Sequence, residues 1–132
     1  MEKEPRLGAA CIVVHENKVL LGKRNKKNAK GLWVIPGGGI NFGEKMIDAA
    51  KREVKEETNI DVEIQKFVDF QEIINIPGEY HSIVFFFLAK PTSFDLVARE
   101  DLSEAKFFSL EEIKKLNKVE SIDIALKKAG LI

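Results

Sequence analysis

Residues 82–89 (SIVFFFLA) form a run that is apolar on both faces of a β-strand. Successive side chains of a strand point to opposite faces of its sheet. A strand of this kind is therefore expected at the centre of a sheet that is covered on both sides. The turn Pro77-Gly78-Glu79 before it predicts an antiparallel hairpin with a long strand at residues 62–76, bulged near Asp69.

The rest of the chain supplies further strands and the helices that could cover such a sheet. Strands are expected at residues 7–14, 18–23, 32–35 and 106–109, with a turn at Glu16-Asn17 between the first two. Helices are expected at residues 44–58, 110–116 and 121–129. Residues 24–31 read as a basic, polar loop and residues 36–43 as a glycine-rich loop. The order predicts an α/β/α fold, a mixed sheet between helices, in one domain over residues 1–132.

Charge and composition exclude several classes of function. The 21 basic and 21 acidic side chains cancel, so no overall field favours nucleic acid or an anionic membrane. No apolar run approaches transmembrane length, and the first five residues do not resemble a secretory leader. The single cysteine, Cys11, lies in an apolar run and is expected to be a small core residue. These features favour a cytoplasmic protein.

The helix expected at residues 44–58 carries an unusual group of charges. Glu53, Glu56 and Glu57 stand at i, i+3 and i+4, so they lie on adjacent positions of one helical face. At about 100° per residue, Glu57 falls within the span of the apolar stripe. That stripe is formed by Met46, Ile47, Ala50 and Val54. A carboxylate that faces a core must be paired or bound to a metal ion.

A solvated face with Glu–Lys pairs is the alternative interpretation of this helix. It suits Lys51 and Lys55 well, but it explains Glu57 poorly. Other familiar motifs fail: Glu44 occupies the place where a Walker A loop needs lysine, and there is neither G-x-G-x-x-G nor H-E-x-x-H. The two histidines, His15 and His81, suggest no nucleophilic triad. For His81 a structural role is favoured, with substrate contact as the alternative.

The segment at residues 38–60 resembles the Nudix box of the Nudix hydrolases, G-x5-E-x7-R-E-U-x-E-E-x-G-U, where U is aliphatic. Gly38, Glu44 and the run at residues 52–60 (REVKEETNI) match it at every specified position except Asn59, which stands in place of glycine. Asn tolerates the left-handed conformation that glycine adopts at a helix end, so the turn is expected to survive. The likeness extends to residues 19–24 (VLLGKR), 31–33 (GLW), 36–38 (PGG) and 107–112 (FFSLEE).

The resemblance implies a set of site residues. Glu53, Glu56 and Glu57 would hold one or more Mg²⁺ ions, with Mn²⁺ as a substitute and the Gly37 or Gly38 carbonyl as an extra ligand. Arg52 would orient the glutamates, and Glu44 would brace the loop and the helix. Arg24 and Lys23 would meet the phosphates. Substrate contacts would also include Gly38, Gly39, Phe42, Tyr80 and His81, whereas Lys26, Lys27 and Lys30 are favoured as a solvated loop.

The reaction that the resemblance implies is hydrolysis of a nucleoside diphosphate linked to another group. Glu53 is the first choice for the general base, and Glu100 and Glu104 are candidates from a later loop. The favoured substrate is a nucleoside triphosphate (NTP or dNTP) cut to the monophosphate and pyrophosphate. The alternatives are a nucleotide sugar, ADP-ribose, or a non-catalytic nucleotide-binding domain.

Two further expectations concern the base of the nucleotide and the assembly. Trp33, Phe42, Tyr80 and Phe87 could stack on a base, although a core role is favoured for Trp33 and Phe87. The resemblance also leaves a homodimer open.

Overall fold

The protein was analysed as a computed structural model that describes residues 3–26, 29–75 and 77–132. Its strands are β1 (Arg6–His15), β2 (Lys18–Arg24), β3 (Trp33–Val34), β4 (Gly37–Gly39), β5 (Val62–Asn75), β6 (Tyr80–Pro91) and β7 (Leu102–Ser109). Its helices are α1 (Met46–Thr58), α2 (Leu110–Lys114) and α3 (Ser121–Lys128). Lys27 and Ile76, which took part in two of the predictions, lie outside the described residues.

The strands form a mixed sheet in which β6 is central, as its sequence predicts. β6 pairs in parallel with β1 and antiparallel with β5. The register along β5 shifts between Phe67 and Asp69, which confirms the predicted bulge. The outer edge of β1 is shared: its first half pairs with β4 and its end pairs with β2, which in turn pairs with β3 and β7.

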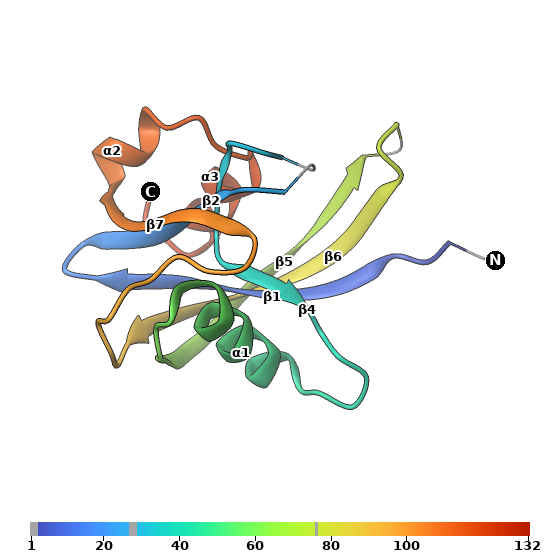
Figure 1. Ribbon diagram of the computed structural model, residues 1–132, viewed down its shortest axis with the longest axis horizontal. Helices are drawn as coiled ribbons and strands as arrows, with labels where there is room; N and C mark the ends of the chain where they lie inside the picture. Colours follow the sequence, from blue (N-terminus) through green and yellow to red (C-terminus); the bar gives the residue numbers. More distant parts are fainter. Residues whose placement is uncertain (1–2, 27–28, 76) are drawn as a thin grey trace.

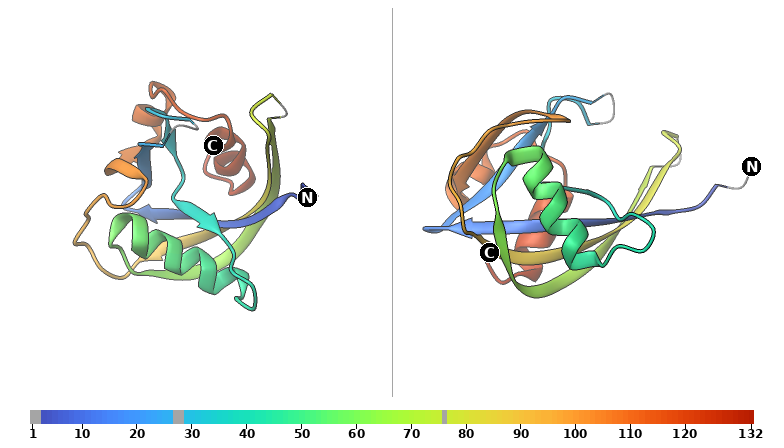
Figure 2. Two further views of the ribbon diagram at one scale, coloured as in Figure 1. Left: turned by 45° about the vertical axis from the view of Figure 1, so that its right-hand side comes forward. Right: turned by 60° about the horizontal axis from the view of Figure 1, so that its bottom comes forward.

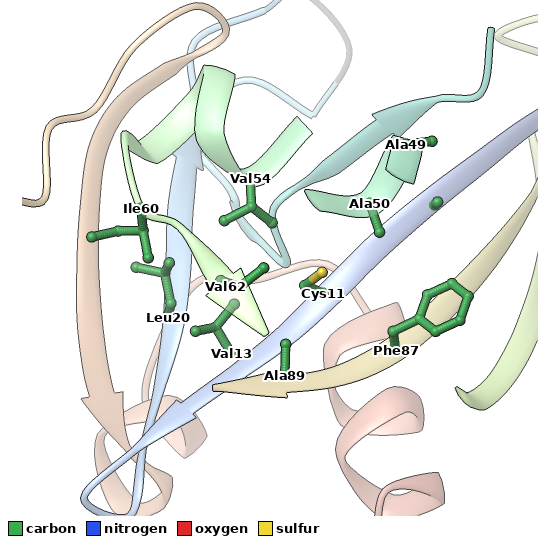
Figure 3. Close-up of a cluster of buried hydrophobic side chains, with 11 residues drawn as sticks. Cys11, Val13, Leu20, Ala49, Ala50, Val54, Ile60, Val62, Phe87 and Ala89 are labelled. Carbon is green, nitrogen blue, oxygen red and sulfur yellow. The ribbon is translucent and has the colours of Figure 1, made fainter. Parts of the chain in front are cut away.

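Helices cover both faces of this sheet, so the predicted α/β/α arrangement is confirmed (Figures 1 and 2). Alternate residues of β1 divide between the two layers. Ala9, Cys11 and Val13 belong to a core cluster with α1 residues, and Ala10 and Ile12 belong to a second cluster with α3 residues. Figure 3 shows the first cluster, in which the Cys11 thiol lies buried beneath α1. Burial raises the pKa of this thiol to about 12, which fits an inert core residue.

The glycine-rich segment differs from the prediction, because residues 37–39 form the short strand β4 and not a loop. β4 pairs with β1 from Gly8 to Ala10, and it lies close to β1 and α1 (Figure 1). A Cβ atom at Gly37 would stand 2.5 Å from the Ala10 Cβ. Glycine is required here because the two backbones approach too closely for a side chain.

The start of α1 also differs from the prediction. The helix begins at Met46 and not at Glu44, whose side chain instead accepts a hydrogen bond from the Asn41 N–H at 3.0 Å. Met46 and Ile47 were placed on the apolar stripe, but they are 40% and 45% exposed. Met46 and Ile47 lie on the same side of the helix as the buried Ala50, so they are exposed because they stand at the end of α1 and not because they face solvent around the helix. The first turn of α1 therefore extends beyond the part of the sheet on which the rest of the helix packs.

The other end of α1 agrees with the sequence. Asn59 ends the helix with φ of 64°, the left-handed value expected for the residue that replaces the box glycine. No helix in the described parts of the chain is long and apolar enough to cross a membrane.

Candidate active site

The last turn of α1 places the Glu57 carboxylate inside the protein. Glu57 is only 4% exposed, and its Oε1 accepts a hydrogen bond from the Gly37 N–H at 2.9 Å. Burial raises the pKa of this carboxyl from 4.5 to about 8, and the Gly37 hydrogen bond opposes that shift. The position that the helical wheel predicted for Glu57 is thus observed, and its partner is the glycine strand β4.

Glu53, one turn earlier, lies against the backbone of the same strand. A Cβ atom at Gly38 would come within 2.3 Å of the Glu53 Oε2, so the glycine leaves room for the carboxylate in this position. Burial raises the pKa of Glu53, while the hydrogen bond from Arg52 opposes the shift. The two carboxylates with raised pKa values, Glu53 and Glu57, therefore both face β4.

Arg52 connects the glutamates with the loop before α1. Its guanidinium donates to Glu44 at 2.8 and 3.0 Å, to the Gly39 carbonyl at 2.8 Å, to Glu53 at 2.8 Å and to Glu56 at 2.5 Å. These hydrogen bonds hold the pKa of the Glu44 carboxyl down at about 2 and raise the pKa of Arg52. Arg52 therefore contacts three glutamates at once, and Glu44 connects the loop before α1 with Arg52.

A cleft of about 660 Å³ opens beside these residues. Its wall on the box side includes Gly37, Gly38, Gly39 and Glu53. Arg24, at the end of β2, lines the same cleft and acts electrostatically on Glu57. The far wall comes from β5, β6 and the start of α3, including Gln71, Tyr80 and Ser121. Gln71 donates to the Ser121 carbonyl at 3.0 Å, which ties this wall to α3.

Several predicted substrate contacts lie elsewhere. Phe42 is fully exposed in the loop before α1 and is not part of the cleft wall. His81 is on the opposite face of β6 from Tyr80 and Ser82, with its Nε2 buried and without a hydrogen-bond partner. Lys23 pairs with Glu104 at 3.4 Å on β7. Trp33 is half-buried against Phe108, and Phe87 is buried, so the core role favoured for both is observed.

The two later-loop carboxylates considered for the general base are also outside the cleft wall. Glu100 is exposed in a turn with φ of 55°, and Glu104 is exposed beside Lys23. The residue after Glu100, Asp101, lines the cleft and contributes to the raised pKa values of Glu53 and Glu57. Asp101 was not among the site residues predicted from the sequence. Its only signal is its place in the acidic run at residues 100–104, because the turn that aims it is not readable from the sequence.

The donor set suits a hard cation such as Mg²⁺, since it offers carboxylate and carbonyl oxygens. Glu57 provides the best fit, because a buried carboxylate with a raised pKa would gain from a positive ion. As the side chains stand, no three acidic, histidine or cysteine residues in the described ranges converge on one point. Glu53 and Glu56 would have to exchange Arg52 for the cation, while Glu44 and the Gly39 carbonyl keep Arg52 in place.

This combination, an α/β/α fold with a glycine strand facing a helix of glutamates, is that of a NUDIX domain. The sequence model of that domain matches residues 4–128, and the chain belongs to this family. It is 31% identical over 112 residues to an ADP-ribose pyrophosphatase of Methanocaldococcus jannaschii, covering 85% of this chain and 66% of the relative. It is 32% identical over 128 residues to an RNA pyrophosphohydrolase of Pelagibacter ubique, covering 84% of this chain and 80% of the relative.

Solved structures agree with this assignment. A MutT NUDIX hydrolase from Burkholderia pseudomallei superposes with a TM-score of 0.88 at 25% identity, covering 96% of this chain and 98% of that one. The chain spans about two thirds of the archaeal relative and 37% of Nudix hydrolase 2 of Arabidopsis thaliana.

Proposed function

We propose that this chain hydrolyses the diphosphate linkage of a nucleoside diphosphate derivative, with a divalent cation as cofactor. The observation that carries the proposal is the buried Glu57 carboxylate, held by the Gly37 N–H at the edge of a cleft that also contains Glu53 and Arg24. An uncompensated carboxylate is costly to bury, and a cation shared with a substrate diphosphate would compensate it.

Glu53, Glu56 and Glu57 are the proposed ligands of Mg²⁺, with Mn²⁺ as a substitute and a carbonyl of Gly37 or Gly38 as an extra donor. The bound ion would neutralise charge on the diphosphate and lower the pKa of water. Because Arg52 is held by Glu44 and the Gly39 carbonyl, it would keep its place beside the glutamates when they turn to the ion.

The remaining steps fall to side chains of the cleft. Arg24 and Lys26 line it and supply positive charge for the phosphate oxygens. Glu53 is the proposed general base. Its carboxylate lines the cleft, and once it has exchanged Arg52 for the cation, the oxygen that does not bind the ion would take the proton of the attacking water.

Two substrate classes are consistent with the cleft. A nucleoside triphosphate, cut to the monophosphate and pyrophosphate, is supported by a likeness to the branch of the family that hydrolyses such compounds. The likeness covers residues 22–24, 31–33, 42–44 and 80–81. ADP-ribose is supported by the archaeal relative and by a cleft that extends from Glu53 to Tyr80 and Ser121. A volume of about 660 Å³ lies within the range of small-molecule sites and leaves room for a group on either side of a diphosphate.

A substrate panel tests the proposal. The chain is incubated with Mg²⁺ and nucleoside triphosphates, deoxynucleotides, ADP-ribose or nucleotide sugars, and the products are separated by chromatography. A nucleoside monophosphate with pyrophosphate identifies the triphosphate class, and a monophosphate with ribose phosphate identifies ADP-ribose. Glu53→Gln serves as the inactive control. A wild-type chain that cuts none of these compounds with Mg²⁺ or Mn²⁺ would refute the proposal.

A further inference from the structure

The residue that departs from the box pattern makes contacts that glycine could not make. Asn59 Nδ2 donates to the Asp95 carbonyl at 2.9 Å, and the Asn59 Oδ1 accepts from the Arg99 guanidinium. Both partners lie in the segment at residues 95–101, which joins β6 to β7. Asn59 therefore makes two separate contributions. Its backbone ends α1, and its side chain binds a loop that lies 36 to 40 residues further along the chain.

The same segment is bonded to the end of α1 by its backbone. The Val97 N–H donates to the Thr58 carbonyl at 3.0 Å, and the Arg99 N–H donates to the Glu57 carbonyl at 2.8 Å. These bonds satisfy carbonyls at the helix end that have no partner inside the helix. One of these carbonyls belongs to Glu57, so the segment is hydrogen-bonded to the backbone of the residue that carries the buried carboxylate.

The turn that follows aims Asp101 at the cleft. Leu102 N–H donates to the Arg99 carbonyl at 3.1 Å, and Glu100 within the turn has φ of 55°. Asp101 then meets the basic loop: its carboxylate lies 2.8 Å from Lys26 Nζ, and its carbonyl accepts from the Asn25 N–H at 2.6 Å. Asp101 thus links the end of α1 with residues 25 and 26, of which Lys26 also lines the cleft.

We propose that Asn59 is a positioning residue that, through Arg99 and Asp95, holds the turn at residues 99–102 so that Asp101 stands beside Glu53 and the basic loop. Asp101 is the residue through which Asn59 affects the reaction, by orienting Lys26 and adding negative charge next to the cation-binding carboxylates. This inference rests on the proposed hydrolysis for its effect on catalysis. The contacts by which Asn59 holds the turn at residues 99–102 do not depend on the proposed hydrolysis.

The test compares Asn59→Gly with Asn59→Asp and with a matched control, Asn17→Gly. Glycine preserves the left-handed helix end, so any effect of Asn59→Gly reports the lost side chain. Aspartate keeps an oxygen that can accept from Arg99. Asn17 has φ of 63° in the β1–β2 turn, so its replacement makes the same chemical change at a left-handed site outside the proposed machinery.

Two readouts are needed, amide hydrogen exchange of residues 95–102 and the steady-state parameters kcat and KM. For Asn59→Gly we expect exchange in this segment to rise about tenfold and kcat to fall about tenfold, the size of effect produced by losing one or two hydrogen bonds. KM should rise, because Lys26 loses part of its orientation, and the thermal midpoint should change little. Asn59→Asp keeps the Arg99 contact but places an oxygen against the Asp95 carbonyl, so it should recover only part of the losses. Asn17→Gly should match the wild type.

The outcomes separate this inference from the proposed function. Unchanged exchange in Asn59→Gly would overturn the inference, and so would raised exchange with unchanged kcat. A wild-type chain that cuts no nucleotide would refute the proposed hydrolysis and with it the catalytic part, and exchange alone would then decide whether Asn59 holds the turn.

Discussion

At the scale of single residues, the site depends on carboxylates that the fold removes from water. Glu57 is almost fully buried and Glu53 packs on the Gly38 backbone, so the pKa values of both are raised. Glu44 has the opposite environment, because Arg52 holds its pKa at about 2. One short segment therefore contains carboxyls that differ widely in proton affinity.

Replacing Glu57 by glutamine should lower kcat by orders of magnitude without unfolding the protein. The amide of the new side chain keeps an oxygen for the Gly37 N–H but lacks the negative charge that would bind a cation. Activity is measured with saturating Mg²⁺, and folding by circular dichroism. Glu63→Gln, at an exposed position paired with Lys90, is the control and should behave as the wild type. Near-normal turnover of Glu57→Gln would contradict the assignment of Glu57 as a ligand.

The raised pKa of Glu57 predicts how stability depends on pH in the metal-free protein. Between pH 4.5 and about 8 the folded state keeps a proton that the unfolded chain has lost. The free energy of unfolding should therefore fall as the pH rises through this window, and Glu53 acts in the same direction. Urea unfolding in EDTA at several pH values measures it. The fall in the free energy of unfolding should be smaller in Glu57→Gln. An equal fall in the variant and the wild type would show that the titration of Glu57 is not its cause.

At the scale of elements, the fit between β4, β1 and α1 decides where the site lies. The glycine strand pairs with β1, lies against the glutamates of α1 and donates the Gly37 N–H to Glu57. The lack of a side chain is a packing requirement at Gly37, where a Cβ would meet the backbone and the Cβ of β1 residues. At Gly38 it leaves room for the Glu53 carboxylate in its present position, and at Gly39 a Cβ would meet no atom within 4 Å.

Gly37→Ala should lower the free energy of unfolding by about 1–3 kcal/mol, because the added methyl group would overlap the Ala10 Cβ and the Ala9 carbonyl. Gly39→Ala makes the same change in open space, and we expect an effect below about 0.5 kcal/mol. Urea denaturation of both variants provides the measurement. Equal stabilities would show that β4 can move away from β1 at little cost.

Elements were predictable from the sequence where a local pattern determines them. The central position of β6, the bulge in β5 and the end of α1 at Asn59 all follow from side-chain period or turn chemistry. Two predictions were wrong: residues 37–39 form the strand β4 and not a loop, and Met46 and Ile47 are exposed and not part of the core. Both errors have one cause. The pairing of β4 with β1, and how far along α1 the sheet buries its side chains, depend on residues distant in the sequence, and the local side-chain period carries no information about them.

At the scale of the whole molecule, the cleft unites segments that are far apart in the chain. The ends of β2 and β4, the helix α1, the start of α3 and the walls of β5 and β6 contribute to it. Asp101 reaches it because residues 97 and 99 bond to the end of α1. The proposed active site therefore requires the whole folded domain and not the box segment alone.

Removal of divalent cations should abolish hydrolysis while the domain stays folded, because the core clusters on both faces of the sheet are formed by apolar side chains. Dialysis against EDTA, an activity assay and circular dichroism test this. Excess Mg²⁺, or Mn²⁺ in its place, should restore the rate. Turnover that persists in the chelated protein would contradict a cation-dependent mechanism.

The sequence by itself determined the helix of glutamates, its glycine-rich approach and the left-handed end at Asn59, because these depend on residues within 23 positions of one another. It did not determine which other side chains share the cleft. Of the residues that the family resemblance had named, Arg24 and Tyr80 line the cleft, whereas Phe42, His81, Glu100 and Glu104 lie elsewhere; tertiary structure alone placed Asp101 there. The physical reason is that strand pairing and loop closure decide which face a distant side chain reaches, whereas helical spacing decides the neighbours within the box.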